Sequence, residues 1–254
     1  MGQYFNWVNF DKNEIIEDWP WPNGNKLHES AYLGCEETDA ALTMLAGDWA
    51  GDFVAFLGDY ATFENETHPK RREAELRLAG TYCEEYIYSC ADICGRFDYT
   101  RDHPETRHPV YEDDDVYETW VPYDGPFDVA IRCYRYVVNE TKKEFVDRFC
   151  TAVRYIDKNT GEIVRYDPFP ELMCSQTGWL EDPENEIEGR WFGDTVRPSD
   201  EHPGDGYATV AQNYSYWAPP SITCSDEEIM RIVAEYGLDI ADEDILAQID
   251  ARLP

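Results

Sequence analysis

Short apolar segments separated by polar turns recur along the chain, a pattern that is typical of β-hairpins. Residues 7–16 read Trp-Val-Asn-Phe-Asp-Lys-Asn-Glu-Ile-Ile, and residues 137–146 read Val-Val-Asn-Glu-Thr-Lys-Lys-Glu-Phe-Val. Each segment places β-prone residues on both sides of an Asn-x-x-Lys turn, in which the Asn side chain can bond its own backbone. Residues 153–166 predict a third hairpin, with Asn159 and Gly161 in its turn. Three hairpins favour antiparallel sheet.

The first two hairpins also resemble one another. Five positions match in kind, namely an apolar residue, Val, Asn, Lys and Glu, and two apolar residues follow. An internal duplication would produce this match, and so would the same turn chemistry used twice. Both explanations stay open, and residues 1–220 are considered as one α+β domain or as two related halves, 1–128 and 129–220.

Helices are predicted between the hairpins. Residues 38–46 form a short helix capped by Thr38 and ended by Gly47, and residues 53–57 then form a buried strand. From residue 69 to 94 the apolar positions recur at helical spacing, with an interruption at Gly80. Residues 97–128 and 181–206, which are rich in Pro, Gly and acids, are expected to be long loops.

The C-terminal residues 221–254 give the clearest helical pattern. Ser225 to Glu228 form a capping box, Gly237 ends the first helix, and apolar residues at helical spacing predict a second helix over residues 241–253. The expected fold is therefore α+β, with antiparallel β-hairpins, short helices and a C-terminal helical hairpin that forms a second unit.

Charge changes this picture more than any motif does. The 254 residues hold 53 Asp and Glu against 21 Lys and Arg, which gives a formal net charge of −32. Such a charge repels polyphosphate and anionic lipid, so direct nucleic-acid or membrane binding is not expected. No stretch of eighteen apolar residues and no basic, then apolar, leader occurs, which predicts a cytoplasmic protein. A basic protein surface is the partner that the charge favours.

The acidity is regional. Residues 105–128, 181–205 and 226–250 carry net charges of −7, −7 and −8, whereas residues 129–180 carry +1. We therefore expect an acidic interaction protein, comparable to immunity proteins or nucleic-acid mimics. The acids expected to contact the partner are Glu112, Asp113, Asp114, Asp115, Glu181, Asp182, Glu184, Glu186, Glu188, Asp226, Glu227 and Glu228. A structural protein whose acidity reflects its environment is an alternative.

A hydrolase that acts on a small molecule or uses a metal is a further alternative. Gly-Asp recurs at 51–52 and 58–59, on either side of the strand over residues 53–57, and again at 47–48, 193–194 and 204–205. Carboxylates at strand ends can build a catalytic or cation site, with Asp52, Asp59 and His28 as the candidates, but Asp also ends strands by ordinary turn chemistry. The common phosphate, dinucleotide, serine-hydrolase and EF-hand signatures are absent, and no cofactor is predicted.

Eight irregularly spaced cysteines predict reduced, mostly buried thiols and not a disulfide framework. Cys83, Cys90 and Cys94 are candidate zinc ligands, and a helix over residues 87–96 would place Cys90 and Cys94 on one face. Packing would explain the same spacing. The aromatic clusters at 19–21 and 214–217 have no Lys or Arg beside them, so they favour core packing or a protein interface over base stacking.

Three segments together resemble a family of uncharacterised bacterial and phage proteins. They are the opening Met-Gly-Gln-Tyr-Phe-Asn-Trp-Val-Asn-Phe-Asp-Lys-Asn-Glu-Ile-Ile, residues 51–60, and the Val-Asn-x-x-Lys-x-Glu hairpin within residues 136–146. The resemblance covers about a third of the chain. It implies no activity, ligand or catalytic residue, and it does not extend to residues 97–128 or to the C-terminal helices.

Overall fold

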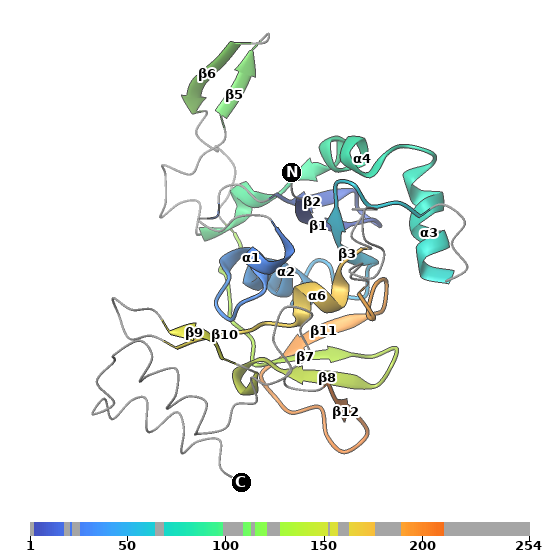
Figure 1. Ribbon diagram of the computed structural model, residues 1–254, viewed down its shortest axis with the longest axis vertical. Coiled ribbons are helices and arrows are strands. Elements are labelled where there is room, and N and C mark those ends of the chain that lie inside the picture. The colour runs from blue at the N-terminus through green and yellow to red at the C-terminus, as the bar shows by residue number, and fades with distance from the viewer. Residues whose placement is uncertain are drawn as a thin grey trace.

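Helices and two four-stranded sheets make up the computed structural model (Figure 1). It describes residues 3–17, 21, 26–63, 69–98, 109–112, 115–120, 128–151, 153–156, 163–175 and 189–210. The α+β class is confirmed. The predicted C-terminal helical hairpin lies outside the described residues. No helix in the described part of the chain combines the length and the apolar character needed to cross a membrane.

The first sheet has the strand order β3-β1-β2-β4. Strands β1 (Phe5–Asn9) and β2 (Glu14–Ile16) form the N-terminal hairpin, and β3 (Val54–Gly58) pairs antiparallel with the other side of β1. The short β4 (Ala91–Asp92) joins β2 in parallel. The sheet is therefore mixed, although its centre is antiparallel.

The second sheet repeats this topology with the order β11-β7-β8-β12. Strands β7 (Tyr136–Asn139) and β8 (Glu144–Asp147) form a hairpin, β11 (Val196–Ser199) pairs antiparallel with β7, and β12 (Ala208–Thr209) joins β8 in parallel. In the first hairpin Asn9 faces Glu14, and in the second Asn139 faces Glu144. The two sheets thus agree in strand order, direction and hairpin register.

Two further antiparallel pairs lie outside these sheets. Strands β9 (Val153–Ile156) and β10 (Ile163–Arg165) pair where the third hairpin was predicted. Strands β5 (Pro109–Glu112) and β6 (Asp115–Trp120) also pair, so the expectation of a loop throughout residues 97–128 is wrong. The acidic run 112–115 dominated that segment in the sequence, but Val and Tyr on both sides of it have high β-propensity.

The helices correct two details of the sequence reasoning. Helix α2 (Glu36–Ala46) begins after Cys35 and not at Thr38, because the Thr38 hydroxyl donates a hydrogen bond to the Ser30 carbonyl instead of capping the helix. The region from residue 69 divides into α3 (Pro69–Leu78) and α4 (Cys83–Ser89), and β4 follows. Cys90 and Cys94 therefore do not share a helix. The remaining described helices are α1 (Leu27–Ser30), α6 (Phe169–Met173) and the 3-10 turns η1 (Cys94–Arg96) and η3 (Arg148–Cys150).

One core is shared by the two sheets. Trp7 and Ile16 of the first sheet join Val137 and Val146 of the second in a single buried cluster, together with apolar side chains of α2 and α6. In Figure 1, α2 and α6 lie between the two sheets. Trp21 belongs to the same cluster, as expected for core packing. Because strand side chains alternate between faces, the neighbours of these residues point outward on both sheets.

The outward faces of the two sheets are covered differently. On the first sheet, Val8 and Ile15 pack in a cluster with residues of α3 and α4. In the described part of the chain, the corresponding face of the second sheet carries a smaller cluster of Tyr136, Val138 and Phe145, against which Tyr207 and the ring of His202 pack. The chain between β3 and β4 contains two helices, whereas only residues 200–207 separate β11 from β12. Helices α3 and α4 are thus an addition to one half of the repeated arrangement.

A buried ion pair ties α2 to the second half of the chain. Arg148 has no exposed surface, and its Nη2 lies 2.7 Å from Asp39 on α2 and 2.6 Å from Asp167, just before α6. Its Nη1 donates to the Tyr134 carbonyl at 2.8 Å. Burial alone would lower the pKa of Arg148, but the charges of Asp167 and Asp39 raise it. This guanidinium stays charged and joins three segments.

Candidate functional site

Two of the candidate hydrolase residues, Asp52 and Asp59, lie at opposite ends of one strand. Asp52 precedes β3 and Asp59 follows it, so about seven residues of extended chain separate them by roughly 20 Å. Asp59 accepts backbone hydrogen bonds from Tyr4 and Tyr60, which is ordinary turn chemistry. His28 belongs to α1, and its side chain lies outside the described part of the structure.

The candidate zinc ligands do not form a metal set. Among the described residues, no group of three or more His, Cys, Asp or Glu side chains is placed to hold a metal ion. Cys83 and Cys94 are buried and Cys90 is half-buried. Burial raises the pKa of Cys83 to about 12 and that of Cys90 to about 11, so both stay protonated thiols at neutral pH.

Most of the acids predicted to contact a partner lie outside the described residues. Glu112 ends β5 and Asp115 begins β6, so the acidic run 112–115 joins the two strands of one hairpin. The predicted contact acids whose structure is not described are Asp113, Asp114, Glu181, Asp182, Glu184, Glu186, Glu188, Asp226, Glu227 and Glu228.

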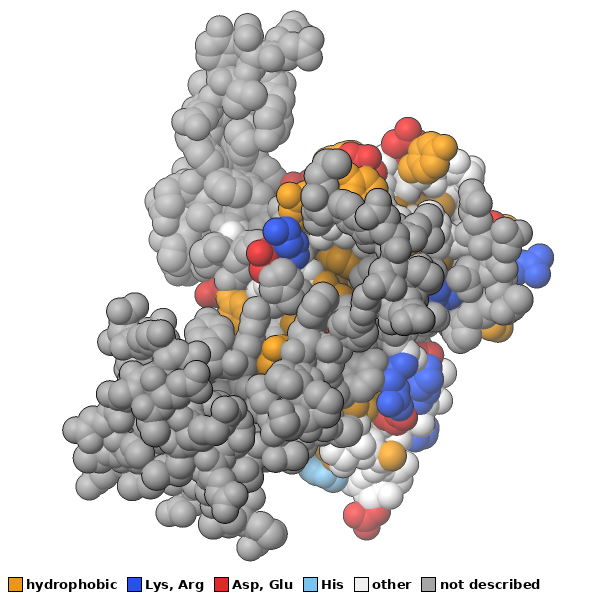
Figure 2. Space-filling model, in the orientation of Figure 1, with side chains coloured by type: hydrophobic (Ala, Val, Ile, Leu, Met, Phe, Trp, Pro, Cys, Tyr) orange, Lys and Arg blue, Asp and Glu red, His pale blue; other side chains and the backbone are white. Residues whose placement is uncertain are grey.

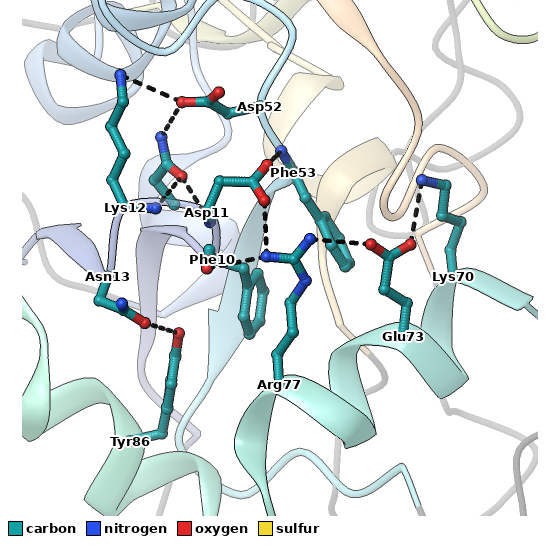
Figure 3. A network of polar contacts seen from close by, with 11 residues as sticks. Phe10, Asp11, Lys12, Asn13, Asp52, Phe53, Lys70, Glu73, Arg77 and Tyr86 are labelled. Carbon is teal, nitrogen blue, oxygen red and sulfur yellow. Dashed lines mark hydrogen bonds and ion pairs between the residues drawn. The ribbon is translucent and has the colours of Figure 1, made fainter.

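A network of polar contacts surrounds the turn of the first hairpin (Figure 3). Asn9 Nδ2 donates to Asp52 at 2.8 Å, while Asn9 Oδ1 accepts the backbone N–H groups of Asp11 and Lys12. Lys12 Nζ lies 3.3 Å from the same Asp52 carboxylate. The Asn side chain therefore closes the turn, as the sequence predicted, and also holds the loop before β3.

Helix α3 extends this network. Arg77 lies between Asp11, at 2.6 Å, and Glu73, at 3.0 Å, and Lys70 lies 3.4 Å from Glu73 (Figure 3). Burial opposes ionisation of Asp11, but the hydrogen bonds from the Phe53 amide and from Arg77 outweigh it and lower the pKa of Asp11. Each cation of this network thus lies beside a carboxylate of the same chain.

The second hairpin has the same contacts. Asn139 Nδ2 donates to Asp194 at 2.8 Å, Asn139 Oδ1 accepts the Lys142 backbone N–H, and Lys142 Nζ lies 2.7 Å from Asp194. A tryptophan indole also bonds the Glu that faces each Asn. Trp49 donates to Glu14 at 2.6 Å, and Trp191 donates to Glu144 at 2.8 Å. The two networks share the same residue types in the same roles.

A sequence signal for these networks was present but not recognised. Trp-Ala-Gly-Asp-Phe-Val at residues 49–54 and Trp-Phe-Gly-Asp-Thr-Val at residues 191–196 share the pattern Trp-x-Gly-Asp-x-Val. Gly51 and Gly193 have φ angles of 84° and 71°, which favour glycine. A Cβ atom on Gly193 would also meet the Lys70 side chain. Two of the Gly-Asp pairs in the sequence therefore belong to turns whose Asp carboxylates hold the Asn and Lys side chains of a hairpin.

A cavity of about 200 Å³ lies at the end of β8 and is lined in part by Asp147, Cys150 and His202. Gly204 N–H donates a hydrogen bond to His202 Nδ1 at 3.0 Å. Burial and the nearby Asp147 raise the pKa of Cys150. Cys150 and His202 are thus two of the residues that line this cavity from different parts of the second half of the chain.

A second cavity, of about 210 Å³, lies between the segment after β3 and the turn that joins α3 to α4. Its lining includes the buried Phe63 and Leu78 and the exposed Glu75 and Tyr82. Tyr82 is 78% exposed, although it is a large aromatic side chain. Figure 2 shows hydrophobic and acidic side chains next to one another over the α4 part of the molecule.

Comparisons with known proteins add no function to these observations. The chain matches no protein-family model, no curated protein and no solved structure.

Proposed function

We propose that the protein is a non-catalytic interaction protein whose acidic surface binds a basic surface of a partner protein, in the manner of immunity proteins or nucleic-acid mimics. The observation that carries this proposal is that basic side chains of the described residues form ion pairs within the chain. In the described residues, Lys and Arg side chains repeatedly form ion pairs with acids of the same chain. These side chains are Lys12, Lys70, Arg77, Arg96, Arg132, Arg135, Lys142, Lys143, Arg148, Arg190 and Arg197.

Internal pairing of the cations matters because the chain has 53 acids and only 21 basic residues. Each pair cancels one charge of either sign, so the surplus acids determine the field around the molecule. Exposed acids on several elements contribute to it, among them Glu75 on α3 and Glu84 and Glu85 on α4. A field of one sign accelerates encounter with an oppositely charged surface and disfavours anionic ligands.

The acidic run 112–115 is the part of this surface that we expect to guide association. The test compares the wild-type full chain with a variant carrying Glu112→Gln, Asp113→Asn, Asp114→Asn and Asp115→Asn. Both are used as bait in an extract of the native host, and retained proteins are identified and then purified. A control bait neutralises four exposed acids that are not among the predicted contact residues, namely Asp48, Asp200, Glu201 and Asp205.

The expected result is a basic protein that the wild-type and control baits retain and the variant loses. With the purified pair, the association rate constant should fall as ionic strength rises, and the variant should associate about tenfold more slowly at low salt. The proposal fails if no basic protein is retained. The assignment of residues 112–115 fails if all three baits retain the partner with the same rate constants.

A further inference from the structure

The cavity between β3, α3 and α4 combines features that suit one kind of occupant. Its floor is apolar, because Ala61, Phe63, Leu78 and Cys83 line it and are buried. Its rim is exposed to solvent and carries a carboxylate and an aromatic ring, those of Glu75 and Tyr82. A space of about 210 Å³ is smaller than the roughly 300–1,000 Å³ clefts that hold drug-sized ligands. It is suited to a single side chain.

The charge at this cavity is negative. Glu84 and Glu85 are exposed in the first turn of α4, directly after the lining residues Tyr82 and Cys83. Asp59 lies two residues before Ala61, and Glu84 contributes to the raised pKa of Asp59, after the larger effect of burial. Asp59 and Glu84 are therefore close enough to repel one another, and a cation placed near both would relieve that repulsion.

The other uses of such a cavity fit poorly. No group of described residues here can hold a metal ion. Burial, and after it the charge of Asp59, raises the pKa of the Cys83 thiol to about 12, so this thiol stays protonated at neutral pH and is not activated as a nucleophile. An anionic ligand would meet Glu75 and Glu84. The chemistry that remains is an apolar stem with a cationic end.

We propose that this cavity receives a single Lys or Arg side chain from the basic partner, with its aliphatic stem against Phe63 and Leu78 and its cationic end beside Glu75 and the ring of Tyr82. Lys and Arg bury their methylene stems on apolar surface while the charged end stays near water. A cation over an exposed aromatic ring gains additional attraction. This inference rests on the proposed function, because it names the contact through which the acidic surface holds its partner.

The surface around the cavity is consistent with a protein interface. Leu76 on α3 is 72% exposed and Tyr88 on α4 is 76% exposed, so each of the two helices that contribute to the cavity lining also exposes a large apolar side chain. Aromatic residues are enriched at protein interfaces, where a few well-placed anchors carry most of the binding free energy. These helices are also the elements that the first sheet has and the second lacks.

The test titrates the ¹⁵N-labelled full chain with the methylamides of N-acetyl-lysine and N-acetyl-arginine and follows the backbone amides by NMR. The methylamide of N-acetyl-norleucine is the neutral control, since it has a similar stem without the charge. We expect saturable shifts of the amides of Phe63, Tyr82 and Cys83 with the two cationic probes, and a Kd at least threefold higher with norleucine.

Variants measure the contributions of the Glu75 charge and of the Tyr82 ring separately. Glu75→Gln should raise the Kd of the lysine probe about threefold, which is the effect of one exposed ion pair. Tyr82→Ala should raise it about fivefold, whereas Tyr82→Phe, which keeps the ring, should leave it unchanged. Glu201→Gln and Tyr88→Ala are controls for lost charge and lost aromatic area outside the cavity, and neither should change the Kd. Unchanged thermal unfolding shows that each variant is folded.

Three results would overturn the inference: shifts that do not saturate, equal affinity for norleucine, or a Kd that Glu75→Gln and Tyr82→Ala do not alter. The titration is independent of the capture experiment. Saturable shifts without any captured basic protein would reject the proposed function and retain the cavity. A captured basic partner together with no saturable shifts at the cavity would retain the proposed function and reject the cavity as its contact.

Discussion

Asn9 and Asn139 occupy equivalent positions in the two sheets, and each donates a 2.8 Å hydrogen bond from Nδ2 to a carboxylate, that of Asp52 or Asp194. The lysine three residues after each Asn lies beside the same carboxylate. The two carboxylates differ in burial, however, because the Asp52 side chain is 22% exposed and that of Asp194 is 5% exposed. The same contacts therefore occur twice in one chain, once around a partly exposed carboxylate and once around a buried one.

This difference in burial predicts unequal costs for the same substitution. Asp194→Ala leaves the buried Asn139 amide and the Lys142 ammonium without their shared acceptor, so we expect a loss of about 2–3 kcal/mol in the free energy of unfolding. Asp52→Ala removes the equivalent acceptor at a more hydrated place and should cost about 1 kcal/mol. Urea unfolding of the two variants measures both values. Equal costs, or the reverse order, would show that burial of this carboxylate does not set its contribution.

The Arg148 ion pair predicts a larger effect. Arg148→Met leaves the carboxylates of Asp39 and Asp167 buried without their cation, which should cost about 3–5 kcal/mol. Arg132→Met is the matched control, because Arg132 pairs with Asp200 at 2.8 Å but both side chains are more than half exposed, so its cost should stay below about 1 kcal/mol.

Denaturant unfolding of both variants at pH 7 provides the comparison. If Arg148→Met is as stable as Arg132→Met, the buried pair does not hold α2 against the second half of the chain. If Arg148→Met does not fold, Arg148→Lys provides a second measurement. Lysine keeps the charge but cannot reach both carboxylates and the Tyr134 carbonyl in the planar arrangement of a guanidinium, so it should still lose stability.

Glu140 predicts a pH dependence. Hydrogen bonds from Lys143 and from Tyr207, with a further contribution from Arg197, lower the pKa of Glu140 from 4.5 to about 2. A carboxyl group with a lowered folded-state pKa adds stability above its unfolded-state pKa, and that stability is lost as the pH falls towards the folded value. The contribution of Glu140 should therefore be complete above about pH 4.5 and disappear towards pH 2.

The measurement is the difference in unfolding free energy between the wild type and Glu140→Gln at several pH values from 2 to 6. We expect this difference to be constant near pH 6 and to shrink as the pH falls below 4.5. Asp205→Asn, which changes an exposed acid of the same half, should show a smaller dependence. A difference that stays constant down to pH 2 would mean that Glu140 does not hold its charge in the folded state.

Local signals in the sequence were sufficient for much of the fold. Alternating apolar residues on both sides of an Asn-x-x-Lys turn predicted the first two hairpins, and the Asn side chain closes both turns. The short apolar run before Gly58 predicted β3 with an offset of one residue. In these cases residues within a few positions of one another decide the structure, so a short window contains the necessary information.

The errors arose where a distant residue decides. Thr38 has the right chemistry for a helix cap, but its hydroxyl bonds the Ser30 carbonyl and α2 begins one turn earlier. The spacing of Cys90 and Cys94 would suit one face of a helix over residues 87–96, yet residues 91–92 form a strand that pairs with β2.

The sequence by itself determined the sign of the charge and the two hairpins with their Asn-x-x-Lys turns, because composition and short-range turn chemistry are properties of the chain alone. Only the tertiary structure showed that both sheets share one core, that Trp-x-Gly-Asp turns lock both hairpins, and that a small apolar cavity lies beneath Glu75 and Tyr82. Those features join residues far apart in the chain, and only packing brings such residues together.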